Sequence, residues 1–170
     1  MSWLKAMNPS TPITTEAEAE RAAKASAISI MIGVVVGLVG LAWTFANPQI
    51  MQDAMANAGG GELGQAQMQA ASQIAMYTAG FMVLLQVIFG FVQWRRPGKF
   101  IAILFLVLLA YGIVSTAATP LLAGSMPNMP HIPAWQIALS LVIMVIQVVL
   151  HVTGLKGIKA LDRIQMEQAR

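Results

Sequence analysis

The chain has 170 residues, of which 57% are hydrophobic and 10% are charged, and its formal net charge is +3. A soluble domain carries about 25% charged residues, so this composition indicates an integral membrane protein. The chain contains no cysteine, which excludes disulfides, thiolate metal sites, iron–sulfur clusters and cysteine nucleophiles.

Residues 1–14 are rich in proline and polar side chains, and we expect this segment to lie at a membrane surface or to be disordered. Thr15 and Glu18 follow with the spacing of a capping box, which predicts the start of a helix. An alanine-rich sequence then continues this helix into the first long apolar stretch.

Four apolar stretches are long enough to cross a bilayer, since about 20 helical residues span a hydrocarbon core about 30 Å thick. They cover residues 25–46, 74–94, 100–122 and 134–155, and none contains Lys, Arg, Asp or Glu. Because lipid offers no hydrogen-bond partner to a free backbone group, each stretch has to be a helix.

We therefore predict an all-α fold, an integral membrane four-helix bundle over residues 15–155 with helical extensions outside the bilayer. Good helix formers before residue 74 extend the second span outward. Residues 156–170 are expected to continue the fourth span as a cytoplasmic amphipathic tail.

The lysines and arginines all lie on one side of these four spans. The loops at residues 47–73 and 123–133 contain none, whereas Arg95, Arg96 and Lys99 lie between the second and third spans. The positive-inside rule then places both termini and this short turn in the cytoplasm. The same three residues are candidates for contact with anionic lipid headgroups, although topology alone explains them. The Ala- and Met-rich composition favours a multi-pass protein of the bacterial inner (plasma) membrane.

Small and polar residues form one narrow face on each span, and such faces mediate helix association in lipid. In the first span Ser29, Gly33, Gly37 and Gly40 share a face, and Gly33 and Gly37 form a GxxxG pair. The sequence leaves open whether this helix-packing face meets another span of the chain or a partner. The other spans carry similar faces, which include Gln86, Gly90 and Gln93, then Tyr111, Ser115 and Thr119, and finally Ser140, Gln147, His151 and Gly154.

Gln86, Tyr111 and Gln147 all fall near the middle of the bilayer in this topology. Because each would be costly facing lipid, we expect the three to face one another and share hydrogen bonds. This polar cluster is interpreted as a structural link between helices, and the alternative is a ligand pocket or a polar path. His151, one turn further, is expected to be a hydrogen-bonded histidine near the interface, with contact to haem or a quinone as the alternative.

The segment at residues 125–136, SMPNMPHIPAWQ, brings together Met126, Met129 and His131. Thioethers and imidazole are ligands that suit Cu(I), so a metal site on the outer face is one interpretation. The favoured interpretation is a stiff proline-rich turn that rests on the headgroups, with Trp135 in the aromatic belt. No cofactor is predicted, and Cu(I) and haem are kept as alternatives.

No catalytic constellation is present: the spans lack paired carboxylates, and GxSxG, HExxH, P-loop and dinucleotide motifs are absent. Aromatic residues do not alternate with a basic groove, so nucleic acid is not an expected partner. We expect a non-enzymatic accessory, assembly or scaffolding subunit of a membrane complex. Its partners would be the bilayer and either other membrane subunits or further copies of itself. The alternative is small-molecule or ion binding or transport by an oligomeric bundle, including copper binding at the outer face.

Overall fold

The computed structural model describes residues 3–49, 61–123 and 132–169, and these residues form helices without any strand. The helices are α1 (Trp3–Ala6), α2 (Glu16–Ala23), α3 (Ala25–Ala46), α5 (Gly61–Arg95), α6 (Lys99–Ala123) and α7 (Ala134–Gln168). Four helical stretches within them are long and apolar enough to cross a membrane: Glu16–Ala46, Gln69–Arg95, Lys99–Leu121 and Ala134–Gln168. The predictions of an all-α chain and of four membrane-length helices are confirmed.

The capping box at the start of α2 is also confirmed. The Thr15 hydroxyl accepts from the Glu18 backbone N–H at 3.3 Å, and Glu18 Oε2 accepts from the Thr15 backbone N–H at 3.2 Å. These bonds satisfy two donors that a helix start leaves free. The helix is interrupted only at Lys24, whose φ of −67° and ψ of −14° remain helical, so α2 leads directly into α3.

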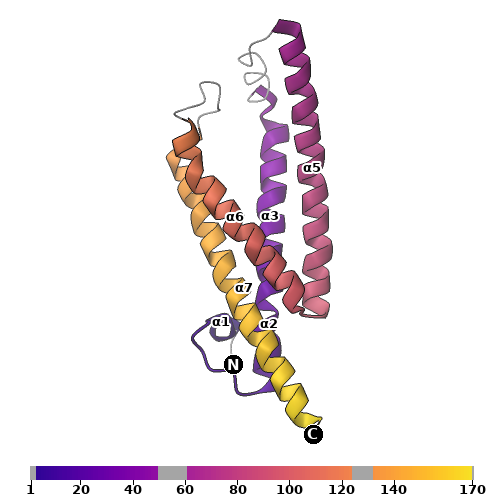
Figure 1. Ribbon diagram of the computed structural model, residues 1–170, viewed down its shortest axis with the longest axis vertical. Coiled ribbons are helices and arrows are strands. Elements are labelled where there is room, and N and C mark those ends of the chain that lie inside the picture. The colour runs from indigo at the N-terminus through magenta and orange to yellow at the C-terminus, as the bar shows by residue number, and fades with distance from the viewer. Residues whose placement is uncertain (1–2, 50–60, 124–131, 170) are drawn as a thin grey trace.

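The helices form a bundle that is open on one side. α3 packs against both α5 and α7, and α6 packs against α7, while α2 lies along the later part of α7. α5 and α6 diverge from the short turn that joins them (Figure 1). Two helix pairs, α3–α5 and α6–α7, therefore meet near that turn and separate toward the opposite end (Figure 1). We call the end that carries the turn and both chain termini the basic end, because Arg95, Arg96 and Lys99 lie there.

A close contact between α7 and the α2–α3 helix lies at the basic end. An added Cβ on Gly154 would lie 2.5 Å from Ser26 Cβ, and one on Gly157 would overlap the backbone of Ala22 and Ala23. Only glycine permits backbones to approach this closely. The contact between Gly154, Gly157, Ala22, Ala23 and Ser26 is called the glycine joint below. Alanines fill the rest of this buried region, in which Ala19, Ala25 and Ala27 are fully buried.

The N-terminal segment packs on α7 at the same end. Lys156 Nζ donates to the carbonyls of Pro9 at 2.7 Å and Thr11 at 3.0 Å. Thr153 Oγ1 donates to the Met7 carbonyl at 3.1 Å. A non-helical, proline-containing segment leaves carbonyls without backbone partners, and these two side chains of α7 supply the missing donors.

The predicted helix-packing face of α3 is divided between two neighbours. Ser29 bonds to α7, and an added Cβ on Gly37 would lie 2.7 Å from Val83 Cγ2 of α5. Gly33 faces both helices, because its Cβ would lie 3.2 Å from Gln86 Oε1 of α5 and 3.2 Å from Gln147 Nε2 of α7. Gly40 has no atom within 4 Å of its added Cβ among those described. The face thus packs inside the chain at its first three positions and is open at the fourth.

Candidate functional site

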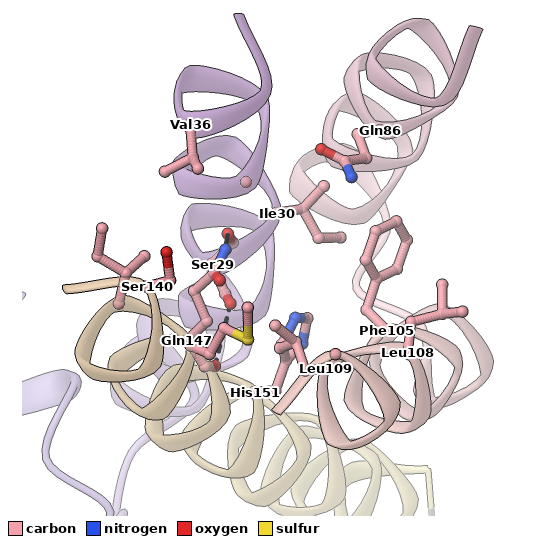
Figure 2. Close-up of a pocket in the computed structure, with 14 residues that line it drawn as sticks. Ser29, Ile30, Val36, Gln86, Phe105, Leu108, Leu109, Ser140, Gln147 and His151 are labelled. Carbon is pink, nitrogen blue, oxygen red and sulfur yellow. Dashed lines mark hydrogen bonds between the residues drawn. The ribbon is translucent and has the colours of Figure 1, made fainter. Parts of the chain in front are cut away.

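A cavity of about 280 Å3 lies between α3, α6 and α7, with one residue of α5 at its edge (Figure 2). Its walls are mainly apolar and include Ile30, Phe105, Leu108, Leu109 and Met144. Polar side chains reach it from three helices, and they are Ser29, Gln86, Ser140, Gln147 and His151. None of the residues that line the cavity carries a formal charge.

Ser29 and Gln147 join α3 to α7 by a reciprocal pair of hydrogen bonds. The Ser29 hydroxyl donates to the Gln147 carbonyl at 3.0 Å, and Gln147 Nε2 donates to the Ser29 carbonyl at 3.0 Å. Gln147 is buried, so this pair satisfies polar groups that would otherwise be costly. The second hydrogen on Gln147 Nε2 is not used by this pair.

Gln86 is directed from α5 toward α3 (Figure 2). Its Oε1 atom is buried and has no hydrogen-bond partner in the described part of the chain. Both Gln86 Oε1 and Gln147 Nε2 approach Gly33, yet no hydrogen bond joins them. The structure thus brings two of the three predicted cluster residues to one glycine without pairing them.

Tyr111 does not belong to this cluster, and the expectation that it faces Gln86 and Gln147 is wrong. Its side chain is 75% exposed and it does not line the cavity. The cavity is lined by α6 residues 105, 108, 109 and 112, and at about 100° per residue position 111 falls outside that face. Tyr111 therefore lies on the outer surface of the bundle, and its hydroxyl forms no hydrogen bond within the described residues.

The Ser26 side chain links polar side chains of two other helices, Gln93 of α5 and His151 of α7. Ser26 Oγ lies 2.9 Å from His151 Nδ1 and accepts from Gln93 Nε2 at 3.3 Å. Gln93 Oε1 in turn accepts from the Gly98 backbone N–H at 3.0 Å. The hydroxyl can accept a second hydrogen bond or donate its own hydrogen, so the direction of the bond between Ser26 and His151 depends on the imidazole tautomer. The His151 ring also stacks on Phe105, with centroids 6.1 Å apart.

The sequence places Gln93 and His151 on the polar faces of two spans but does not indicate that both bond to Ser26 of a third. The pairing depends on how far each helix is rotated toward its neighbours, which spacing along one chain does not give. Ser26 and His151 are at the distance of a nucleophile and its base. However, Ser26 is fully buried, it does not line the cavity, and no carboxylate among the described residues bonds to the ring.

The three predicted lipid-contact residues have different neighbours. Lys99 forms a salt bridge of 2.5 Å with Asp162 of α7, and the Arg95 guanidinium lies 5.1 Å from the centroid of Phe91. Arg96 is exposed at the turn. Lys99 instead joins a surface groove of about 590 Å3 on α7, whose other basic residues are Lys156, Lys159 and Arg163.

The predicted copper ligands Met126, Met129 and His131 lie outside the described residues. Within the part of the chain that is described, no group of three or more His, Asp or Glu side chains is placed to hold a metal ion. Comparisons of the chain with protein-family models, with curated proteins and with solved structures found no match.

Proposed function

We propose that the chain is a non-enzymatic membrane protein that binds a helix of another membrane protein along α6, as an accessory or assembly subunit. Four helices of membrane length support its insertion in a bilayer. The lysines and arginines at the basic end support a cytoplasmic position for both termini, in a bacterial inner membrane.

The outward position of Tyr111 is the observation that carries this proposal. With Lys99 at the headgroups, a rise of 1.5 Å per residue puts Tyr111 about 18 Å along α6, near the middle of a hydrocarbon core about 30 Å thick. Its hydroxyl has no partner within the described chain, and leaving it unpaired in lipid costs a few kcal/mol. A neighbouring helix with a hydrogen-bond acceptor would remove this cost.

The residue one turn further along α6 makes close approach of such a helix possible. Ser115 is exposed, and its hydroxyl is already satisfied by the Gly112 carbonyl at 3.0 Å. A small residue such as Ser115 lets the backbone of a second helix come close in lipid. Tyr111 and Ser115 are therefore the centre of the proposed contact.

Within residues 3–49, 61–123 and 132–169, no accessible reactive group is found, which supports a role without catalysis. Ser26 and His151 are the pair with the geometry closest to a nucleophile and base, and the buried Ser26 hydroxyl is already committed to Gln93 and His151. A substrate in the cavity would meet amide, hydroxyl and imidazole groups without a charged acid or base. Such groups bind and orient molecules rather than transform them.

The test is recovery of partner proteins from native membranes with tagged wild type, Tyr111→Phe and Tyr77→Phe. Tyr77 is a matched control, because it is 76% exposed on α5 and lies about 27 Å from Arg95, near the far interface where its hydroxyl reaches water. An interhelical hydrogen bond contributes about 1 kcal/mol. We therefore expect Tyr111→Phe to lower recovery of a specific membrane protein about three- to tenfold, and Tyr77→Phe to leave it unchanged.

Two results would contradict the proposal. Wild type that purifies as a monomer without any enriched membrane protein would remove the accessory role. An oligomer that contains only copies of this chain, and that Tyr111→Phe weakens, would show that the contact at Tyr111 is self-association rather than binding of a different protein.

A further inference from the structure

The buried acceptor at Gln86 is a feature that the chain itself leaves unsatisfied. Oε1 of Gln86 has no hydrogen-bond partner in the described residues, and a buried polar atom without a partner costs about 1–3 kcal/mol. Unpaired buried polar atoms in native proteins are uncommon and often indicate a water or ligand. The missing partner has to be a donor.

A donor that also accepts would satisfy a second group at the same place. Gln147 Nε2 uses one hydrogen on the Ser29 carbonyl at 3.0 Å, and it approaches the same glycine, Gly33, as Gln86 Oε1 does. A hydroxyl group placed there donates to Gln86 Oε1 and accepts the other hydrogen of Gln147 Nε2. A carbonyl or ether could only accept, and an ammonium could only donate.

The rest of the cavity is suited to an apolar body. Ile30, Phe105, Leu109 and Met144 form its walls, and its volume of about 280 Å3 is close to the lower end of small-ligand pockets. Because no charged side chain lines it, a charged headgroup would not be compensated there. The occupant is therefore neutral.

The lining of the cavity is sparsest on the side of α5, and we infer that the cavity opens between α5 and α6. α5 contributes only Gln86 to the lining, and the two helices diverge from their common turn (Figure 1). At the basic end this gap is closed by the edge-to-face contact of Phe89 with Phe105, whose centroids lie 5.9 Å apart. The apolar tail of a ligand whose polar group is bound in the cavity could extend between α5 and α6, beyond the contact of Phe89 with Phe105.

We propose that this cavity binds an uncharged lipophilic alcohol or phenol, with its hydroxyl between Gln86 Oε1 and Gln147 Nε2 and its apolar chain directed out between α5 and α6. The proposal is independent of the partner contact at Tyr111, which lies on another face of α6. Each of the two can therefore fail without the other.

The experiment compares a diazirine-bearing hexadecanol with its methyl ether, using the full chain in phosphatidylcholine vesicles. The ether keeps the acceptor but lacks the hydrogen that Gln86 Oε1 requires. One hydrogen bond contributes about 1 kcal/mol, so we expect half-maximal photolabelling at about a five- to tenfold lower mole fraction of the alcohol. Labelled peptides should come from the cavity walls on α3, α6 and α7.

Two variants test whether the preference for the alcohol over the ether depends on Gln86. Gln86→Leu removes the acceptor and should abolish the difference between alcohol and ether, while its thermal midpoint stays equal or rises because an unpaired polar atom is removed. Gln69→Leu, at an exposed position of α5, should keep the difference. Equal labelling of wild type by both probes would overturn the proposal, and so would a preference that survives Gln86→Leu. The comparison of the two probes on wild type decides the matter even if a variant fails to fold.

Discussion

Gly37 lies at a close contact between α3 and α5, three residues before a glycine with no such contact. A Cβ at position 37 would lie 2.7 Å from Val83 Cγ2, whereas one at position 40 would meet no described atom within 4 Å. The branched Val83 side chain has few alternative rotamers, so the two helices would have to move apart. The two glycines therefore form a matched pair for measuring packing inside this bundle.

We expect Gly37→Ala to destabilise the protein by about 1–3 kcal/mol through overpacking. Gly40→Ala should be neutral or slightly stabilising, since alanine is the better helix former. Thermal unfolding in mild detergent, followed by circular dichroism, measures both variants against wild type. Equal destabilisation by the two substitutions would show that the α3–α5 contact is not as described.

The difference between Gly37 and Gly40 could not be predicted from the sequence. The spacing of Ser29, Gly33, Gly37 and Gly40 predicts a face for close packing, because small residues recur on one side of a helix. The spacing does not show which helix each residue packs against, or that an added Cβ on Gly40 contacts no described atom within 4 Å. That depends on the angle between α3 and α5, which is set by every contact along both helices.

At the scale of elements, the N-terminal segment is held by two side chains of α7 across more than 140 positions of sequence. Lys156 donates to two carbonyls of the segment, and Thr153 donates to a third. The glycine joint lies beside it and brings α2 against α7. Neither contact has a local sequence signal, because each pairs ordinary residues at distant positions.

Removing the Lys156 ammonium should release this segment without opening the bundle. In Lys156→Met we expect the amide hydrogens of residues 5–11 to exchange about two- to tenfold faster, as hydrogen bonds at an exposed site contribute about 0.5–1.5 kcal/mol. Exchange in α3 and α6 should stay unchanged. Hydrogen–deuterium exchange with mass spectrometry measures both.

Lys159→Met is the control, because Lys159 is exposed on the same helix and forms no hydrogen bond within the described residues. It removes the same charge and should leave exchange of the N-terminal segment as in wild type. Faster exchange in both variants would indicate that overall charge, rather than the bonds to Pro9 and Thr11, holds the segment.

At the scale of the whole molecule, the helices themselves follow from length and apolarity, whereas their arrangement does not. The first predicted span, residues 25–46, coincides with α3, and the three other spans each lie within one longer helix. An 18-residue apolar stretch is recognisable in any sequence. The rotation of α6 about its axis is not recognisable in this way, and for this reason the expected polar cluster contained Tyr111, which does not line the cavity.

The proposed topology can be tested directly because the chain has no cysteine of its own. We expect Gln69→Cys to react with a membrane-impermeant maleimide in intact cells, since it would lie on the outer extension of α5. Ser10→Cys and Gln168→Cys should react only after the membrane is opened, as both would be cytoplasmic. The reverse pattern would invert the orientation, and reaction of all three in intact cells would exclude a sealed four-span topology.

The sparse lining of the cavity on the side of α5 bears on how the proposed ligand would reach it. If this side of the bundle faces hydrocarbon, a ligand arrives by lateral diffusion in the bilayer rather than from water. Its relevant concentration is then its share of the membrane lipids, and strongly partitioning molecules reach high local levels at low total amounts. A change in lipid composition would thus alter the state of this protein without any change in the aqueous medium.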